Sequence, residues 1–213
     1  MEQFATEEQQ VEAIKRFWKE NGMAIILGAV IGFGGLWGWR YYSDSQLTAK
    51  EAASLEYQSV IESLQSDDPT TKAEAFIESY GDSGYATITS LIMASQAVDS
   101  GDLAAAEKYL STAASTNEPA LQSIALLRLA RVQVAQGNAQ QALDSVAKIN
   151  DEAFSAQIEE VKGDAYVALA DFTKARLAYS AAVEADANNR LVKMKLDNLA
   201  VASTEATATA SDS

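Results

Sequence analysis

GNAQQALDSVAKI, at residues 137–149, shows a pattern of small and bulky residues that occurs twice more in the chain. An earlier copy, GDLAAAEKYLSTA, lies at 101–113, and a later copy, ADFTKARLAYSAA, lies at 170–182. The starts of successive copies are 36 and 33 residues apart. Each copy opens with a turn residue, places a small residue five positions later, and places a bulky one four positions after that. An interval near 34 residues predicts a stack of helix pairs.

Three kinds of position recur in these copies. The turn residues are Gly101, Gly137 and Ala170. The small residues at the helix crossings are Ala106, Ala142 and Ala175, and the bulky contacts are Leu110, Val146 and Tyr179. The preceding helix of each pair also supplies a small residue, which is Ala94, Ala130 or Gly163. These features resemble tetratricopeptide repeats and predict an all-α fold, an α-solenoid. The alternative is a plain helical bundle.

Composition narrows the possible functions. With 213 residues, 48% of them hydrophobic, the chain can build one sizeable core. The absence of cysteine and histidine excludes disulfides, thiolate nucleophiles, Ser-His pairs and the usual zinc sites. Among 30 acidic residues, carboxylate pairs arise by chance, and no phosphate-binding glycine loop precedes a helix. We therefore expect no catalytic residues, no metal, no cofactor and no enzymatic activity.

The net charge of −14 is unevenly distributed. Residues 1–22 carry −2 and Arg40 adds +1, so the chain from Ser43 onward carries −13. Such a surface repels nucleic acid phosphates and anionic lipid headgroups. The expected partners are therefore proteins, rather than nucleic acid or a small-molecule substrate.

A transmembrane helix is predicted near the N-terminus. Met23 to Trp39 reads MAIILGAVIGFGGLWGW, within 19 uncharged residues between Glu20 and Arg40. As a helix this run extends roughly 28 Å, close to the hydrocarbon thickness of a bilayer. Aromatic residues flank both ends, as is typical of membrane interfaces: Phe17, Trp18, Trp37, Trp39, Tyr41 and Tyr42. The alternatives are a buried core helix and a cleaved signal peptide, and the bulky residues after the run favour a retained anchor.

Basic residues predict the orientation of this helix. Lys15, Arg16 and Lys19 precede the apolar run, whereas only Arg40 follows it closely. Because basic residues favour the cytoplasmic side, we expect a single-pass membrane protein with a cytoplasmic N-terminus. The C-terminal domain would then be translocated, which in a bacterium places it in the periplasm.

Small residues lie along one side of the predicted span. Ala24, Gly28, Gly32 and Gly35 recur at intervals of four, four and three residues, as in Gly-x-x-x-Gly contacts between membrane helices. Such residues allow two helix backbones to approach closely. We predict a contact with another membrane helix here, and the alternative is that glycine is only tolerated in the span.

The chain is expected to have five segments. They are a cytoplasmic segment at 1–20, the transmembrane helix at 21–42, linking helices at 43–83, the repeats with a capping helix at 84–200, and a disordered tail at 201–213. Asp67 and Asp68 before Pro69 predict the start of a linking helix. The capping helix is expected to cover the last repeat with Leu191, Met194, Leu196 and Leu199.

The first helices of the pairs are expected to form a partly apolar groove that holds a segment of another protein. The candidate groove residues are Ile88, Leu91, Ser95, Val98, Ile124, Leu127, Arg131, Val134, Glu160, Asp164 and Val167. The alternative is that N-terminal helices cover several of them. Arg128 and Arg131 could hold a partner's carboxylate, since a guanidinium presents a planar fork. Alternatively, the two arginines pair with acidic residues of an adjacent helix.

Several stretches together resemble a known family. They are QVEAIKRFWKENG (10–22), the glycine-rich span, GWRYY (38–42), EAASLEYQ (51–58) and LRLARVQVAQGNAQQAL (127–143). They closely resemble the YfgM-type ancillary subunits of the SecYEG translocon. The resemblance implies an inner-membrane anchor, a periplasmic tetratricopeptide-like domain, and an accessory role for newly translocated proteins beside a PpiD-like chaperone. A tetratricopeptide scaffold for another envelope assembly, such as cytochrome maturation or division, is the alternative, and an enzyme of unknown type is a further one.

Overall fold

The computed structural model describes residues 7–64, 69–81 and 83–199. Every regular element in these ranges is a helix, which confirms the predicted all-α fold. The chain forms two compact units, Met1–Ala52 and Ala53–Ser213. The helix start predicted at Asp67 and Asp68 and the tail predicted to be disordered lie outside the described residues.

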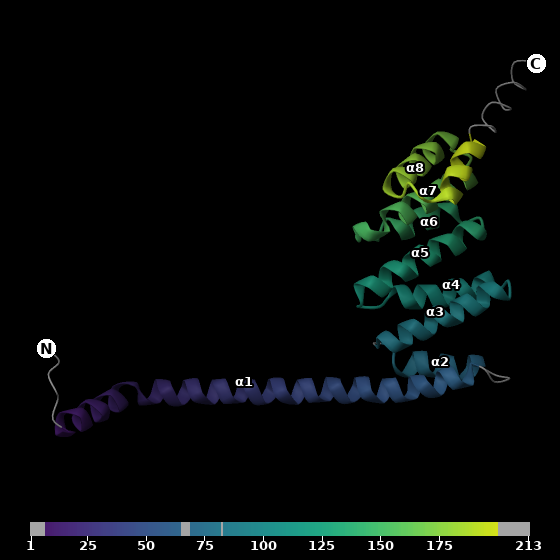
Figure 1. Ribbon diagram of the computed structural model, residues 1–213. Helices are drawn as coiled ribbons and strands as arrows, with labels where there is room; N and C mark the ends of the chain where they lie inside the picture. Colours follow the sequence, from purple (N-terminus) through teal and green to yellow (C-terminus); the bar gives the residue numbers. More distant parts are fainter. Residues whose placement is uncertain (1–6, 65–68, 82, 200–213) are drawn as a thin grey trace, which may run out of the picture. The chain divides into compact units, whose positions relative to one another are not determined.

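The N-terminal unit consists of most of one helix, α1, which extends from Glu7 to Ser63 (Figure 1). By length and composition α1 contains a candidate membrane span, and 6% of its most apolar window is buried. The core helix of a soluble domain would bury most of such a window. The structure has no helix end between the predicted span and residues 43–63, so the apolar segment and the first linking helix belong to one element.

The second unit contains the end of α1, a linking helix α2 (Pro69–Ser79) and three helix pairs. The pairs are α3 (Gly84–Asp99) with α4 (Leu103–Ala114), α5 (Pro119–Ala135) with α6 (Ala139–Val146), and α7 (Ser155–Ala168) with α8 (Phe172–Ala185). A short 3-10 helix, η1 (Glu152–Phe154), precedes α7. A last helix covers 190–199. Figure 1 shows the pairs stacked in chain order.

The three pairs turn the chain in the same way. The predicted turn residues Gly101, Gly137 and Ala170 have φ angles of 79°, 83° and 58°, in the left-handed region. After each one, the next backbone N–H donates to a carbonyl five residues earlier, which closes the end of the first helix. These bonds are Asp102 to Ala97 (2.8 Å), Asn138 to Gln133 (2.8 Å) and Asp171 to Tyr166 (2.9 Å).

Small residues allow the paired helices to approach closely. The three crossing alanines, the three bulky contacts and the small residues of the first helices are all buried, as the repeat pattern predicts. The third pair shows how close this approach is, at Gly163 in α7. A Cβ there would collide with the ring of Tyr179 in α8.

The last helix continues the repeat. The first helices begin at residues 84, 119 and 155, and the last helix begins at 190, so successive intervals are 35, 36 and 35 residues. Helix 190–199 therefore occupies the position that the first helix of a fourth repeat would take. It packs on Ala175 and Tyr179 of α8 through Val192, Leu196 and Leu199. Leu191 and Met194, which were predicted to cover the third repeat, are exposed.

Candidate functional site

A groove of ≈ 330 Å³ lies at the junction of the first two repeats, where α3, α4 and α5 meet. Its walls come mainly from α3 and α5, the first helices of those repeats. Its lining residues are Leu91, Ala94, Ser95, Val98, Leu103, Leu110, Arg128, Arg131, Val132 and Ala135. The groove is therefore mostly apolar, with two arginines from α5.

The predicted groove residues of the first two repeats lie at different depths. Leu91, Ser95, Val98 and Arg131 line the groove. Leu127 is buried in the core with residues of α6 and α7. The remaining three are half-buried and are not among its lining residues: Ile88, Ile124 and Val134.

The two arginines lie on the same face of α5, because residues three apart in a helix are neighbours. Arg131 Nη2 lies 3.8 Å from Glu160 Oε2, and the Arg131 side chain is 47% exposed. Arg128 is exposed, and it forms no ion pair with any residue that the structure describes. Both guanidinium groups therefore keep hydrogen-bond donors for another molecule.

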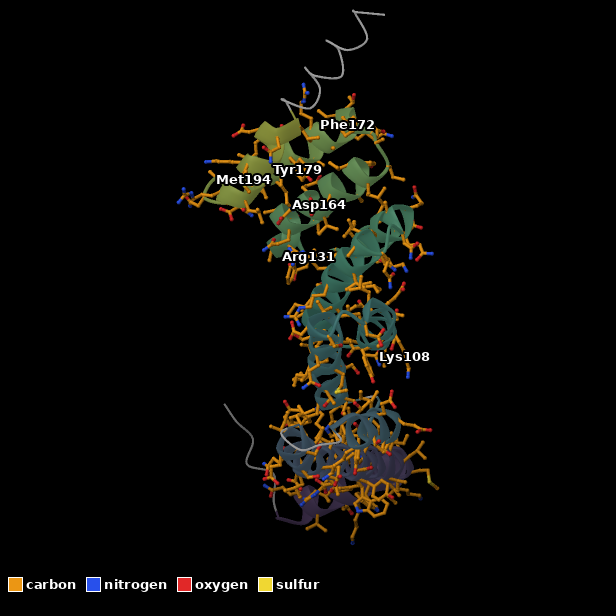
Figure 2. The ribbon with its side chains drawn as sticks, turned by 90° about the vertical axis from the view of Figure 1, so that its right-hand side faces the viewer. Lys108, Arg131, Asp164, Phe172, Tyr179 and Met194 are labelled. Atoms are coloured by element: carbon orange, nitrogen blue, oxygen red, sulfur yellow. The ribbon has the colours of Figure 1, made fainter. Side chains whose placement is uncertain are left out.

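The predicted groove residues of the third repeat have a different environment. Lys195, from helix 190–199, places its Nζ 2.9 Å from Glu160 Oε1 and 2.7 Å from Asp164 Oδ2. The Tyr179 hydroxyl donates to Asp164 Oδ1 at 2.6 Å. Figure 2 shows Arg131, Asp164 and Tyr179 following one another along the stack.

Burial and hydrogen bonds shift the pKa values of Lys195 and Tyr179 in this cluster. Burial disfavours the Lys195 ammonium, but its hydrogen bonds to Asp164 and Glu160 outweigh burial and raise its pKa. Burial and the bond to Asp164 raise the pKa of Tyr179. The bonds of Glu160 and Asp164 to Lys195 therefore hold the last helix against α7. Val167, the other predicted groove residue of α7, is exposed.

Sequence reasoning did not identify Lys195. The signal that could have found it is the interval of 35 residues from the start of α7 to the last helix. Because α7 packs against α5, the same interval places helix 190–199 against α7. The polar side chains of helix 190–199 then meet the acidic face of α7.

A second polar cluster joins α2 to α4. The Glu74 carboxylate accepts from Lys108 Nζ at 3.1 Å and from the Tyr109 hydroxyl at 2.9 Å, and these bonds lower its pKa. Burial, together with the bond to Glu74, raises the pKa of Tyr109 to about 12. This cluster stabilises the packing of α2 and lies outside the groove.

The small-residue stripe of the predicted span is open. A Cβ added at Gly28, Gly32 or Gly35 would meet nothing within 4 Å. Within the described ranges, no group of three or more acidic side chains is arranged to hold a metal ion.

Comparison with known proteins identifies the family. Residues 15–201 match the model of the tetratricopeptide repeat-like domain. A protein of Escherichia coli named ancillary SecYEG translocon subunit is 35% identical over 94% of this chain and 100% of its own length. A protein of Haemophilus influenzae with the same name is 34% identical over 91% of this chain and 97% of its own length. No solved structure matches the chain.

A more distant relative agrees. A Neisseria gonorrhoeae protein, again named ancillary SecYEG translocon subunit, is 26% identical over 91% of this chain and 97% of its own length. These matches confirm the resemblance inferred from the sequence, and the tetratricopeptide-like nature of the helix pairs. With its apolar N-terminal helix and its stacked repeats, the chain belongs to the family of ancillary SecYEG translocon subunits.

Proposed function

We propose that this protein is an inner-membrane accessory of the bacterial Sec translocon, with a cytoplasmic N-terminus and periplasmic repeats. It binds proteins rather than catalysing a reaction, and it assists newly translocated chains beside a membrane-anchored chaperone similar to PpiD. The observation that carries this proposal is the match to the Escherichia coli relative over 94% of this chain and 100% of that protein. Both the apolar segment and the repeats fall within that match.

The anchor and the groove have separate roles in this proposal. The anchor holds the repeats at the membrane, which raises their effective concentration near a translocon exit. The groove between α3 and α5 supplies the protein-binding surface. In the third repeat, the bonds of Glu160 and Asp164 to Lys195 support limiting this surface to the first two repeats.

Affinity purification from membranes in mild detergent tests the partner. A tagged full-length chain is expected to recover the translocon channel and a periplasmic chaperone. The matched control is a tagged chain in which residues 21–42 are replaced by an unrelated apolar span. Recovery of cytochrome-maturation or division proteins without the translocon would instead support the alternative envelope assembly.

Single cysteines test the orientation, since the natural chain has none. Ser100→Cys and Glu12→Cys both place the thiol at an exposed residue of the structure. With only the outer membrane opened, a membrane-impermeant thiol reagent is expected to label Ser100→Cys and not Glu12→Cys. The opposite pattern would show that the repeats are cytoplasmic.

A further inference from the structure

We infer that the groove between α3 and α5 binds an internal segment of another polypeptide in which a large apolar side chain lies close to an aspartate or glutamate. This inference rests on the proposed role as a protein-binding scaffold and specifies the chemistry of the bound segment.

The apolar part of the groove sets the size of the bound side chain. Leu91, Leu110 and Val132 are buried beneath it, and Val98 at its edge is 44% exposed. Its volume of ≈ 330 Å³ is near the lower end for ligand pockets. The groove therefore fits a leucine or phenylalanine side chain with its neighbouring backbone.

The arginines supply the polar part of the recognition. The contact of Arg131 with Glu160 is long, at 3.8 Å, and Glu160 already accepts from Lys195 at 2.9 Å. Arg128 has no ion-pair partner among the described residues. A carboxylate beside the apolar side chain would accept two parallel hydrogen bonds from such a guanidinium.

The charge of the whole domain makes this pair distinctive. The chain from Ser43 onward carries −13, so an acidic segment is repelled by most of the surface, and Arg128 and Arg131 are the basic residues that line the apolar groove. Positive charge beside apolar surface therefore distinguishes this site from other exposed basic residues. Residues 200–213 of this chain have carboxylates but no aromatic residue, leucine, isoleucine or methionine, so they are a poorer occupant than another protein.

A random-peptide display library tests the inference. The full-length chain, embedded in nanodiscs of neutral phospholipid, is the target for panning. The library displays randomised segments inserted within the display protein, so that no peptide has a free end. Recovered peptides are expected to be enriched in a leucine or phenylalanine within about one helical turn of an aspartate or glutamate. Arg128→Gln with Arg131→Gln is expected to abolish the acidic enrichment.

The matched control removes two positive charges elsewhere. Arg190→Gln with Lys193→Gln changes two exposed residues of the last helix and is expected to leave the acidic enrichment unchanged. Thermal unfolding of both double variants checks that they remain folded. An acidic enrichment that is absent, or that survives the Arg128 and Arg131 changes, overturns the inference.

A synthetic peptide gives the quantitative test. The most enriched sequence, blocked at both ends, is compared with a version in which glutamine or asparagine replaces its acid. Losing either the carboxylate or the two guanidinium groups is expected to weaken binding about tenfold, and losing both is expected to add little more. If the losses of binding free energy from the peptide change and from the arginine changes were additive, the carboxylate and the guanidinium groups would not be in contact.

This result is separable from the proposed function. Panning contains no translocon, so a failed enrichment leaves the purification result intact. Conversely, recovery of a different envelope assembly would leave the peptide chemistry of the groove intact.

Discussion

Gly163 shows how strictly a single residue is determined by the packing of a repeat. Its backbone lies so close to the ring of Tyr179 that any side chain would require the ring to move. The repeat pattern predicted a small residue at this position, because the equivalents in the first two repeats are alanines. The pattern did not predict that alanine would be too large here, because that depends on the tyrosine in α8.

Gly163→Ala is expected to lower the free energy of unfolding by about 1–3 kcal/mol, the usual cost of overpacking, although alanine favours helix. Gly84→Ala is the matched control, because the nearest atom to a Cβ there is Leu121 Cδ1 at 4.0 Å. Chemical denaturation of the two variants measures the difference. Equal midpoints for Gly163→Ala and the natural chain would contradict the packing.

Ala170 is the only non-glycine residue with a positive φ in the described ranges, at 58°. A left-handed conformation costs a residue with a Cβ roughly 1–2 kcal/mol. Ala170→Gly is therefore expected to raise the melting temperature, and Gly137→Ala at the equivalent turn to lower it. If both changes shifted the melting temperature in the same direction, the turns would not be equivalent.

At the scale of elements, the helix pairs and their order could be predicted from the sequence, because turns and crossings depend on local residues at fixed intervals. The contacts of the last helix could be predicted only in part. Leu196 and Leu199 pack on α8 as expected, whereas Leu191 and Met194, which fit the same apolar pattern, are exposed and Val192 is buried. The orientation of this helix follows from the contacts of Lys195 with α7, and the apolar pattern alone does not contain those contacts.

Lys195→Met removes the link between the last helix and α7. It leaves Glu160 and Asp164 without their ammonium partner, and the Glu160 side chain is 10% exposed. The expected loss of stability is about 2 kcal/mol, within the range for unpairing a buried charged group. Lys193→Met, at an exposed residue of the same helix, is the control. Equal losses in the two variants would exclude a specific role for the cluster.

The same variant predicts a dependence on pH. The pKa of Lys195 is raised in the folded chain, so the folded state holds this proton more tightly than the unfolded state does. The contribution of the Lys195 ammonium to the free energy of unfolding is therefore complete below the ordinary pKa of 10.5, and it declines as pH rises above that value. The stability gap between the natural chain and Lys195→Met is expected to narrow in that range. A gap that widens would contradict the assignment.

At the scale of the whole molecule, the acidic charge, the apolar segment and the repeats could be read from the sequence. The groove could be predicted only in part. Leu91 and Val98 were identified, but Leu103 and Ala135, which also line it, were not. Periodicity shows which face of a helix points inward, whereas a groove depends on the gap left between two successive first helices.

The small-residue stripe of the apolar segment gives a prediction for the assembled protein. Gly28 and Gly32 lie one helical turn apart, and both have open space where a side chain would begin. Replacing both by leucine keeps the segment apolar enough to insert and prevents close approach of another helix. If this face contacts a membrane partner, crosslinking from the span to that partner is expected to fall, while the repeats remain folded.

The control enlarges two side chains on the opposite side of the helix. Gly34 lies two residues beyond Gly32, which is about 200° around the helix axis, and Val30 lies two beyond Gly28. Val30→Leu with Gly34→Leu is therefore expected to preserve the crosslink. If the Gly28 and Gly32 variant also preserved it, the glycines would only be tolerated in the span. Recognition of the membrane partner would then belong to the repeats, where the groove variants can locate it.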